Sequence, residues 1–446
     1  MQRIASLLDP KNPAYSLRRA LVRLWVLASD PVRLNSWEQA SNEASIAPQI
    51  PILLSQLDSD VPIDIQLVET QPLALIRALD DYLSGTTQAK SRFTFNPGIF
   101  SAQEEGKDYW LVPVHLAARR QAVIHRQPAR LARWFHRHAV LPAVTKHNVE
   151  VKVRRSRSML DKVLHQLSTE PDAMLKVWLA HFTDGADVEW DTSLSPVGNW
   201  RTRCVAPSET RLASMLQALK MANEAGAHIV VFPEFSLDLQ HRTQLAQFLT
   251  ENPSAIQMVV AGAFHEPERP DAPELAYNTA PVLTGNGMQL FAHRKLSLYG
   301  KADFGAEFAQ MGNQLHVLLT PIGCMTVLIC KDFMDIDPRV DNLLAEVPVD
   351  WIWVPSYGNE TTLKAHKKRA KELATVTVGT SSAVANTQNT ASKTAGLAQD
   401  LLPGFGHAGG KDRSQDMGHA GGLVLFSLAK QVPPPESGRP AIRRIK

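Results

Sequence analysis

Cysteine is scarce in this sequence of 446 residues, which contains only Cys204, Cys324 and Cys330. Such an odd and sparse set cannot form the disulfide framework of a small secreted domain. Charged side chains also recur through the first thirty residues, so no hydrophobic segment of a signal peptide is expected there. We therefore predict a protein of the reducing cytoplasm.

Long apolar runs are missing as well. The most apolar uncharged stretch, residues 317–330, contains Pro321 and Gly323 and is too short to cross a bilayer, so no membrane association is expected. A glycine-rich ATP-binding loop is absent, which argues against an attached ATP-dependent synthetase. The net charge of +3 is unevenly distributed: acids dominate residues 58–81, and basic residues and histidine dominate residues 115–160.

The length of the chain predicts at least two domains. The segment of residues 168–172 is polar and contains a proline, as linkers do. We therefore predict an N-terminal domain of unknown role at residues 1–168, a second domain at residues 174–430 and a flexible tail at residues 431–446. The N-terminal domain is expected to be mixed α/β, with one helix and three strands. The helix is predicted at residues 17–28 and the strands at residues 63–68, 109–116 and 149–153.

After residue 174, predicted strands alternate with predicted helices, which is the pattern of an α/β domain. Strands are expected at residues 177–182, 228–232, 258–263, 281–283, 289–293, 315–319, 325–329, 351–354 and 375–385. Helices are expected at residues 212–222, where Gly226 can end the helix, and at residues 362–374. The turn Thr284-Gly-Asn-Gly287 predicts a hairpin between two of these strands.

Three reactive side chains directly follow apolar segments of the second domain. Glu234 follows the strand near residue 230, Lys295 follows the predicted hairpin, and Cys330 follows the strand at residues 325–329. Ligand sites in α/β folds lie at strand ends. A carboxylate, an ammonium group and a thiol are groups that nucleophilic catalysis uses. Taken singly, each also has an ordinary explanation: a surface glutamate, an exposed lysine or a buried structural cysteine.

The order of these three residues resembles the catalytic Glu, Lys and Cys of the nitrilase superfamily of carbon–nitrogen hydrolases. Further segments resemble the same family in the same order, namely Ala261–Phe264, Tyr277–Ala280, Pro355, Ala365–His366, Arg369–Ala370 and Val384–Asn386. The resemblance covers roughly residues 175–430. It implies a four-layer α-β-β-α sandwich that usually dimerises through helices beside the active site. It implies no cofactor and no metal.

The resemblance also implies catalytic roles. Glu234 would remove the proton of Cys330, because a thiol of ordinary pKa is mostly protonated at neutral pH. Cys330 would attack the carbon of an amide or nitrile and form a thioester. Lys295 would stabilise the anion that develops on the substrate.

Four further residues are assigned through the resemblance. Glu307 is the candidate for a second glutamate that orients the lysine, and the backbone N–H of Lys331 would contribute to an oxyanion hole. Tyr299 and His366 are candidates for the substrate pocket, although His366 can also be a helix-packing histidine. The sequence departs from the family at Lys331, where an aromatic residue is usual, and after Asp332. It therefore does not identify the substrate.

The leading hypothesis is an amidase-type hydrolase, acting as a homodimer or larger homo-oligomer on a small linear amide. A nitrile or carbamoyl substrate is the alternative within the same chemistry. A second hypothesis is a regulatory or effector protein that uses the hydrolase fold as a scaffold. Its N-terminal domain would bind a protein or nucleic-acid partner through the basic stretch Arg119 to Arg157, which includes Trp134 and Phe135. A solvated basic face, or one that docks on residues 58–81, is the favoured explanation of that stretch, because no recognised nucleic-acid module accompanies the charge.

Overall fold

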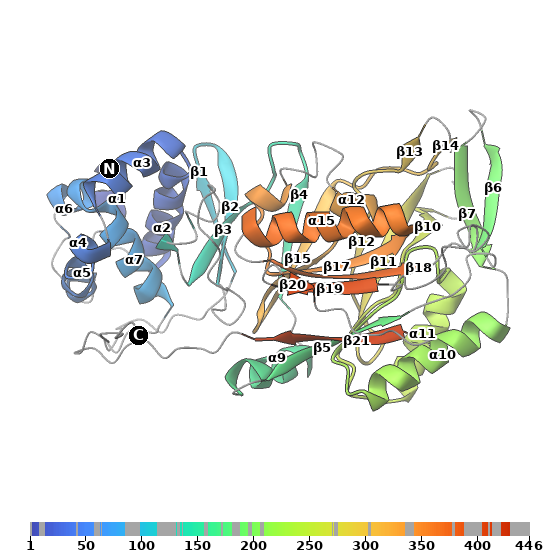
Figure 1. Ribbon diagram of the computed structural model, residues 1–446. Helices are drawn as coiled ribbons and strands as arrows, with labels where there is room; N and C mark the ends of the chain where they lie inside the picture. Colours follow the sequence, from blue (N-terminus) through green and yellow to red (C-terminus); the bar gives the residue numbers. More distant parts are fainter. Residues whose placement is uncertain are drawn as a thin grey trace.

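The computed structural model describes the chain in a series of segments. They are residues 2–8, 14–41, 43–57, 63, 65–84, 99–113, 131, 134–135, 137–155, 159–170, 173–180, 188–194, 199–205, 209–269, 271, 275–301, 305–334, 343–376, 380–387, 404–408, 411–412 and 421–428. Figure 1 shows a helical N-terminal region beside a larger region that is built on two sheets.

The N-terminal region consists of short helices followed by one antiparallel sheet in the order β1-β2-β3. Its elements are α1 (Gln2–Leu7), α2 (Ala14–Ala28), α3 (Pro31–Ala40), α4 (Glu43–Ile46), α5 (Gln49–Leu57), α6 (Ile65–Thr70), α7 (Pro72–Leu83), β1 (Phe100–Glu104), β2 (Lys107–Pro113) and β3 (His138–Pro142). The helix predicted at residues 17–28 is confirmed as α2. The strand predicted at residues 63–68 is wrong, because residues 65–70 form α6 and Val68 packs into the helical core. Six residues of alternating polarity are too few to distinguish a strand from a short helix.

The aromatic pair of the basic stretch belongs to this core. Trp134 and Phe135 are buried, and the ring centroid of Phe135 lies 4.7 Å from that of Trp25. These two rings are therefore not available to stack on a nucleic acid. Much of the basic stretch, including residues 119–130, lies outside the described residues. The protein or nucleic-acid partner and the homo-oligomer stay predictions.

Most of the remaining strands form two sheets of seven strands each. The first sheet has the order β10-β11-β9-β8-β5-β21, and β12 pairs with β11. Its strands are β5 (Met174–Ala180), β8 (Ile229–Val231), β9 (Met258–Val260), β10 (Phe264–Pro267), β11 (Ala276–Thr284), β12 (Gln289–Arg294) and β21 (Gly421–Ser427).

The second sheet has the order β20-β19-β18-β17-β16-β15-β4. Its strands are β4 (Glu150–Arg155), β15 (Gln314–Thr320), β16 (Gly323–Val327), β17 (Trp351–Tyr357), β18 (Ser381–Thr387), β19 (Gly404–Ala408) and β20 (Lys411–Asp412). Two further ladders are separate from both sheets: β6 (Val188–Leu194) with β7 (Asn199–Val205), and β13 (Gly300–Lys301) with β14 (Gly305–Ala306).

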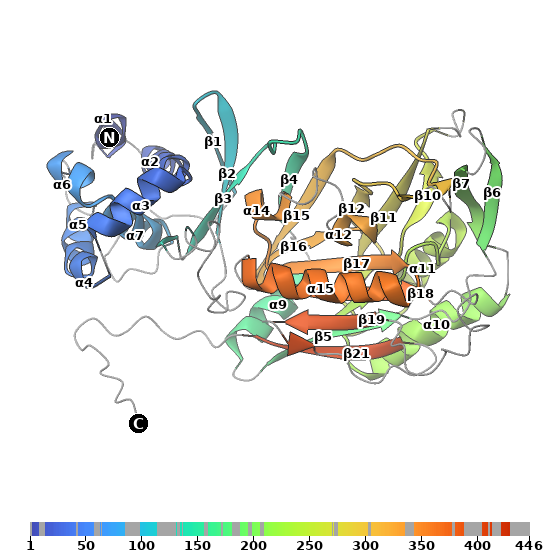
Figure 2. The same cartoon turned by 45° about the horizontal axis from the view of Figure 1, so that its top comes forward.

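Apolar packing joins the sheets to each other and to helices on their outer faces. The core between the sheets combines Val177 and Val231 with Val327 and Trp353. Helices α10 (Glu209–Glu224) and α11 (Leu239–Glu251) cover the outer face of the first sheet. Helices α12 (Lys331–Met334), α14 (Leu343–Glu346) and α15 (Glu360–Val376) pack on the second. Figures 1 and 2 show α15 and α10 on opposite sides of the strands. The predicted α/β class is confirmed.

The predicted boundary near residue 170 needs a correction. Strand β4 lies before it, yet β4 pairs in parallel with β15 and completes one edge of the second sheet. Helix α9 (Met159–Thr169) also lies before it, and Leu160 and Leu164 of this helix join the core between the sheets. The predicted boundary therefore falls within one packed region. Composition predicts a connection but does not tell whether the packing continues across it.

Several local predictions in the second region are confirmed. The hairpin of β11 and β12 turns at residues 284–287, where Gly287 has a φ of +79° and a Cβ would lie 2.2 Å from the carbonyl oxygen of Ala246. Only glycine fits such a position. Gly226, with a φ of +65°, follows the end of α10. The strand predicted from residue 375 starts later, because α15 extends to Val376 and β18 begins at Ser381.

Two further predictions concern the C-terminal tail and helices that could span a membrane. The tail at residues 431–446 lies outside the described residues. Across the described segments, no helix combines the length and the apolar character needed to cross a membrane.

The pairing of β4 predicts where the chain can be shortened. A chain that begins at Ala173 lacks β4 and α9, so we expect it to expose the edge of β15 and to aggregate. A chain that begins at Ala143 keeps both elements, and we expect it to melt cooperatively. Size-exclusion chromatography and thermal unfolding followed by circular dichroism compare the two. Cooperative melting of a soluble chain that begins at Ala173 would contradict this expectation.

Candidate active site

Glu234 follows β8 of the first sheet and reaches across to the second. Its N–H donates to the carbonyl of Ser356 at 3.3 Å, and it forms an isolated bridge with Ala263. The next residue, Phe235, has a φ of +55°. Left-handed backbone is rare for a residue with a Cβ and often marks a functional site.

Lys295 follows β12, and its N–H donates to the carbonyl of Asn278 on the neighbouring strand β11. Its ammonium group donates to Oε1 of Glu234 at 2.8 Å and to Oε2 of Glu307 at 2.9 Å. Residues 234, 295 and 307 are only 1%, 2% and 3% exposed. A buried charge is stable only when it is paired and hydrogen-bonded, and the three charged side chains of this cluster pair with one another.

Both carboxylate oxygens of Glu307 take part in hydrogen bonds. Its Oε1 accepts from Nδ2 of Asn278 at 2.7 Å and lies 2.9 Å from Nε2 of His265. Its Oε2 accepts from the N–H of Tyr299 at 2.9 Å, in addition to Lys295. Asn278 also donates to Glu234 at 2.9 Å. One amide therefore links the two carboxylates and fixes the distance between them.

Cys330 lies at the end of β16, directly before α12. Its φ of +43° is left-handed, and its N–H donates to the carbonyl of Pro355 at 2.9 Å. The sulfur lies 3.5 Å from Oγ of Ser356 and 3.7 Å from the carbonyl oxygen of Tyr357. Residues 355 and 356, at the end of β17, thus bind the backbones of both Cys330 and Glu234.

A buried carboxylate joins the lysine segment to the cysteine turn. Asp332 accepts from the N–H groups of Leu296 and Ser297, at 3.0 and 2.7 Å, and from the N–H of Ile329 at 3.2 Å. His293 also lies 3.4 Å from it. Because Asp332 binds the residues that follow Lys295 and the residue that precedes Cys330, it fixes the position of one segment relative to the other.

The charges in this cluster shift one another's pKa. Burial raises the pKa of Glu234, and this effect is opposed by Lys295. Burial would lower the pKa of Lys295, but Glu234 and Glu307 hold it well above its ordinary value. Burial would raise the pKa of Glu307, but Lys295 and the hydrogen bond from His265 bring it below its ordinary value. Lys295 and Glu307 are therefore the stable ion pair, and Glu234 is the carboxylate that can accept a proton.

The thiol is protonated at rest. Burial, followed by the charge of Glu234, raises the pKa of Cys330 to about 12. A thiolate is the reactive form, so a nucleophilic Cys330 needs a base beside it. Glu234, whose charge acts on Cys330, is the group with that chemistry.

Aromatic rings enclose this cluster. Trp190 of β6 lies with its ring centroid 5.2 Å from that of Trp200, 5.4 Å from Phe235 and 5.7 Å from Tyr357. The carbonyl of Trp200 accepts from the N–H of Phe308, next to Glu307. Figures 1 and 2 show the β6–β7 hairpin at the end of the molecule away from the N-terminal helices.

The structure brings together most of the residues predicted from the sequence. Glu234, Lys295 and Glu307 form one hydrogen-bonded cluster, and the charges of Glu234 and Lys295 act on the thiol of Cys330. Tyr299 is half-buried, and its ring centroid lies 6.3 Å from that of Trp200.

The positions of His366 and Lys331 bear differently on the predictions made for them. His366 is fully buried and hydrogen-bonds Ser356, so it does not line an open pocket. The side chain of Lys331 donates to the carbonyl of Leu298 at 2.5 Å. As the first residue of α12, Lys331 has no acceptor for its N–H within that helix, so a role for this N–H in an oxyanion hole stays a prediction.

Sequence reasoning missed several residues of the site. Asn278 lies in a segment that resembles the family, but its role was not assigned. His265, Ser356, Trp190 and Trp200 carried no signal, because each lies within or beside a strand where a structural role is the ordinary interpretation. Their positions depend on contacts between segments that are far apart in the sequence.

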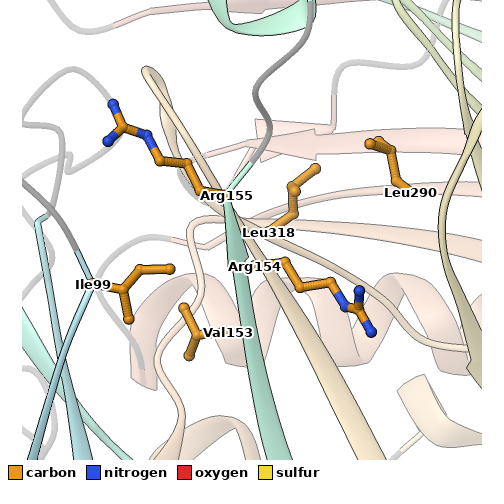
Figure 3. Close-up of a pocket in the computed structure, with 6 residues that line it drawn as sticks. All are labelled: Ile99, Val153, Arg154, Arg155, Leu290 and Leu318. Atoms are coloured by element: carbon orange, nitrogen blue, oxygen red, sulfur yellow. The ribbon is translucent and has the colours of Figure 1, made fainter.

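A cavity of about 330 Å³ lies away from this cluster. Figure 3 shows its lining, which comes from β4, β12, β15 and the residue before β1: Ile99, Val153, Arg154, Arg155, Leu290 and Leu318. None of the residues predicted for the site lines it. Within the part of the chain that the structure describes, no group of three His, Cys, Asp or Glu side chains could hold a metal ion.

The carbon–nitrogen hydrolase family model matches residues 204–334 of this chain. The matched segment contains Glu234, Lys295, Glu307 and Cys330. The family resemblance predicted from the sequence is thereby confirmed, while the N-terminal region matches no family model. A search of curated proteins found no match.

Solved structures similar to this chain include an amidase and a protein named Nit3. An amidase from Nesterenkonia sp. is 20% identical, over 57% of this chain and 90% of the amidase, with a TM-score of 0.41. Nit3 of Saccharomyces cerevisiae, a member of branch 10 of the nitrilase superfamily, is 19% identical, over 60% of this chain and 94% of Nit3, with a TM-score of 0.41.

The buried ion pair predicts a pH-dependent stability. Glu307→Gln removes one carboxylate from Lys295, and we expect the free energy of unfolding at pH 7 to fall by about 3–5 kcal/mol. Folding lowers the pKa of Glu307, so its stabilisation is present above its ordinary pKa of 4.5 and is lost as the pH falls further. The difference in melting temperature between the wild type and the variant should shrink below about pH 4.5.

The matched control is Glu268→Gln, which breaks the exposed pair of Glu268 with Arg294. We expect it to change stability by about 1 kcal/mol or less at either pH. A difference for Glu307→Gln that stayed constant from pH 7 to pH 3 would contradict this expectation, because it would mean that folding does not lower the pKa of Glu307.

Proposed function

We propose that the protein is an amidase-type hydrolase that cleaves the carbon–nitrogen bond of a small linear amide through a thioester on Cys330. The observation that supports it most is the buried cluster of a carboxylate, an ammonium group and a thiol at the ends of β8, β12 and β16. The match of residues 204–334 to carbon–nitrogen hydrolases supports the same class of reaction. A nitrile or carbamoyl substrate is the alternative, because it would undergo the same first attack.

In the first half of the reaction, Glu234 takes the proton of Cys330 and the sulfur attacks the carbonyl carbon. The carbonyl oxygen becomes an anion, and the ammonium group of Lys295 stabilises it by charge and hydrogen bonding. The tetrahedral intermediate then breaks its carbon–nitrogen bond. Glu234 gives its proton to the leaving nitrogen, so ammonia or an amine departs and a thioester with Cys330 remains.

In the second half, water attacks the thioester carbon. Glu234 accepts a proton from this water, and the carbonyl oxygen again becomes an anion beside Lys295. Breaking the carbon–sulfur bond releases the carboxylic acid and returns the proton to Cys330. Glu307 takes no proton in this scheme, since its role is to keep Lys295 charged and in place.

The nucleophile prediction has a direct test. Cys330→Ala should abolish amide hydrolysis and leave the melting temperature nearly unchanged, because alanine is close to cysteine in size. Cys204→Ala is the matched control and should keep wild-type turnover. Mass spectrometry of the wild-type protein mixed with amide should show an acyl adduct on the peptide containing Cys330. Retained turnover in Cys330→Ala would end the proposal.

The aromatic enclosure supports an uncharged substrate with an apolar or aromatic acyl group. Phe235 and Tyr357 neighbour the catalytic cluster: the ring centroid of Phe235 lies 6.0 Å from Nζ of Lys295, and the carbonyl of Tyr357 lies near the thiol. Two cationic side chains of these segments are engaged, Arg201 with Asp191 at 3.6 Å and Lys331 with a carbonyl oxygen. An anionic substrate would lose its hydration there without gaining a counter-charge.

The substrate class can be tested with matched amides. We expect kcat/KM to be at least about tenfold higher for a benzamide-type or short aliphatic amide than for an amide of similar size bearing a carboxylate. Trp190→Ala should raise KM for the aromatic amide by roughly tenfold, since a ring contact is lost. Trp37→Ala, in α3 of the N-terminal region, is the control. A preference for the carboxylate-bearing amide would contradict this assignment.

A further inference from the structure

Cys330 has a second polar neighbour besides the carboxylate–lysine cluster. The hydroxyl of Ser356, near the end of β17, lies 3.5 Å from the sulfur of Cys330. The same hydroxyl lies 3.0 Å from Nε2 of His366 on α15. Ser356 and His366 are both fully buried. Water therefore does not compete for these hydrogen bonds, and the three side chains form a continuous path.

The direction of this path follows from the imidazole. Burial lowers the pKa of His366 to about 3, so the ring is neutral and carries one proton. Its Nδ1 has no hydrogen-bond partner among the described residues. A buried N–H without an acceptor is rarer and less favourable than a buried lone pair without a donor. The proton therefore resides on Nε2, which faces Ser356.

We propose that His366 and Ser356 form a directed hydrogen-bond chain that ends on the sulfur of Cys330 and stabilises its thiolate. Nε2–H of His366 donates to Oγ of Ser356, and the hydroxyl proton of Ser356 points at the sulfur. Ser356 touches the reacting atom and is a catalytic residue in this scheme. His366 acts through Ser356 and is a positioning residue. The inference rests on the proposed role of Cys330 as the nucleophile.

This hydrogen-bond chain adds a donor to the sulfur besides the charge of Lys295, which also favours the thiolate. The negative charge of Glu234 opposes formation of a thiolate, and the ammonium group of Lys295 is shared between two carboxylates. The titratable groups of α12 are engaged elsewhere: Lys331 with a carbonyl oxygen and Asp332 with backbone N–H groups. When Cys330 ionises, its proton passes to Glu234, and the sulfur accepts the hydrogen bond of Ser356. No proton moves to His366.

The experiment measures how fast iodoacetamide alkylates Cys330 at different pH values, with peptide mass spectrometry as the readout. A hydrogen bond to a charged group corresponds to a factor of roughly ten to a hundred. We therefore expect Ser356→Ala to slow alkylation of Cys330 by that factor throughout the pH range below the thiol pKa. Alkylation needs no substrate, so this result is independent of whether the amide hydrolysis is found.

The histidine is tested by a pair of variants. His366→Gln can present an amide N–H where Nε2–H stood, so it should keep most of the wild-type profile. His366→Met has no donor and should slow alkylation in the same pH range, as Ser356→Ala does. A purely structural role would give the two variants a common loss of stability without separating their pH profiles.

Two controls complete the design. Ser382→Ala removes another buried serine, on the neighbouring strand β18, whose hydroxyl has no partner among the described residues. It should leave the profile of Cys330 unchanged. Cys204 is an internal reference in every sample. A wild-type alkylation rate in Ser356→Ala overturns the proposal. If that variant does not fold, identical alkylation rates in His366→Gln and His366→Met overturn it.

Discussion

The ammonium group of Lys295, buried between the carboxylates of Glu234 and Glu307, is the interaction on which the rest of the site depends. An ammonium group removed from water is strongly destabilising unless charge and hydrogen bonds replace its hydration. Two carboxylates supply the charge, but they would repel each other if nothing separated them. Asn278 bridges them, and His265 and a backbone N–H hold Glu307. These partners together satisfy the carboxylates that compensate the buried lysine.

The end of β17 connects this electrostatic cluster to the thiol. Pro355 accepts from the backbone of Cys330, and Ser356 accepts from the backbone of Glu234. These two residues are neighbours in the sequence, whereas Glu234 and Cys330 come from different sheets. The relative position of the carboxylate and the sulfur therefore depends on how the two sheets pack, because one dipeptide contacts both. A change in how the two sheets pack would therefore move the carboxylate of Glu234 relative to the sulfur of Cys330, even if each sheet stayed intact.

Part of this arrangement could be predicted from sequence, and the reason is local. Glu234, Lys295 and Cys330 each follow an apolar segment, so the change from a run of apolar residues to a reactive side chain marks them in the sequence. Ser356 and His265 are not distinguished in this way, because polar residues ordinarily alternate with apolar ones along a half-buried strand. His366 was predicted near the site but as a pocket residue: helical periodicity tells which face of α15 is buried and not which side chain it meets.

The long-range pairings were beyond prediction for a different reason. Parallel strands need no short turn between them, so nothing near β4 indicates β15 as its partner. The side chains of Gln314 and Glu150 hydrogen-bond across 164 positions of sequence. A boundary was therefore predicted where the composition changes, although the sheet continues across it.

This connectivity has a consequence for the way the protein is made. During synthesis, β4 and β5 leave the ribosome long before β15 and β21, with which they pair. Both sheets thus remain incomplete until the last third of the chain is available, and one of them until residue 427. Folding is slow when long loops must close, at a cost in conformational entropy, before the strands that they join can pair. The nascent chain must carry unpaired strand edges throughout this interval, and dependence on chaperones should be concentrated there.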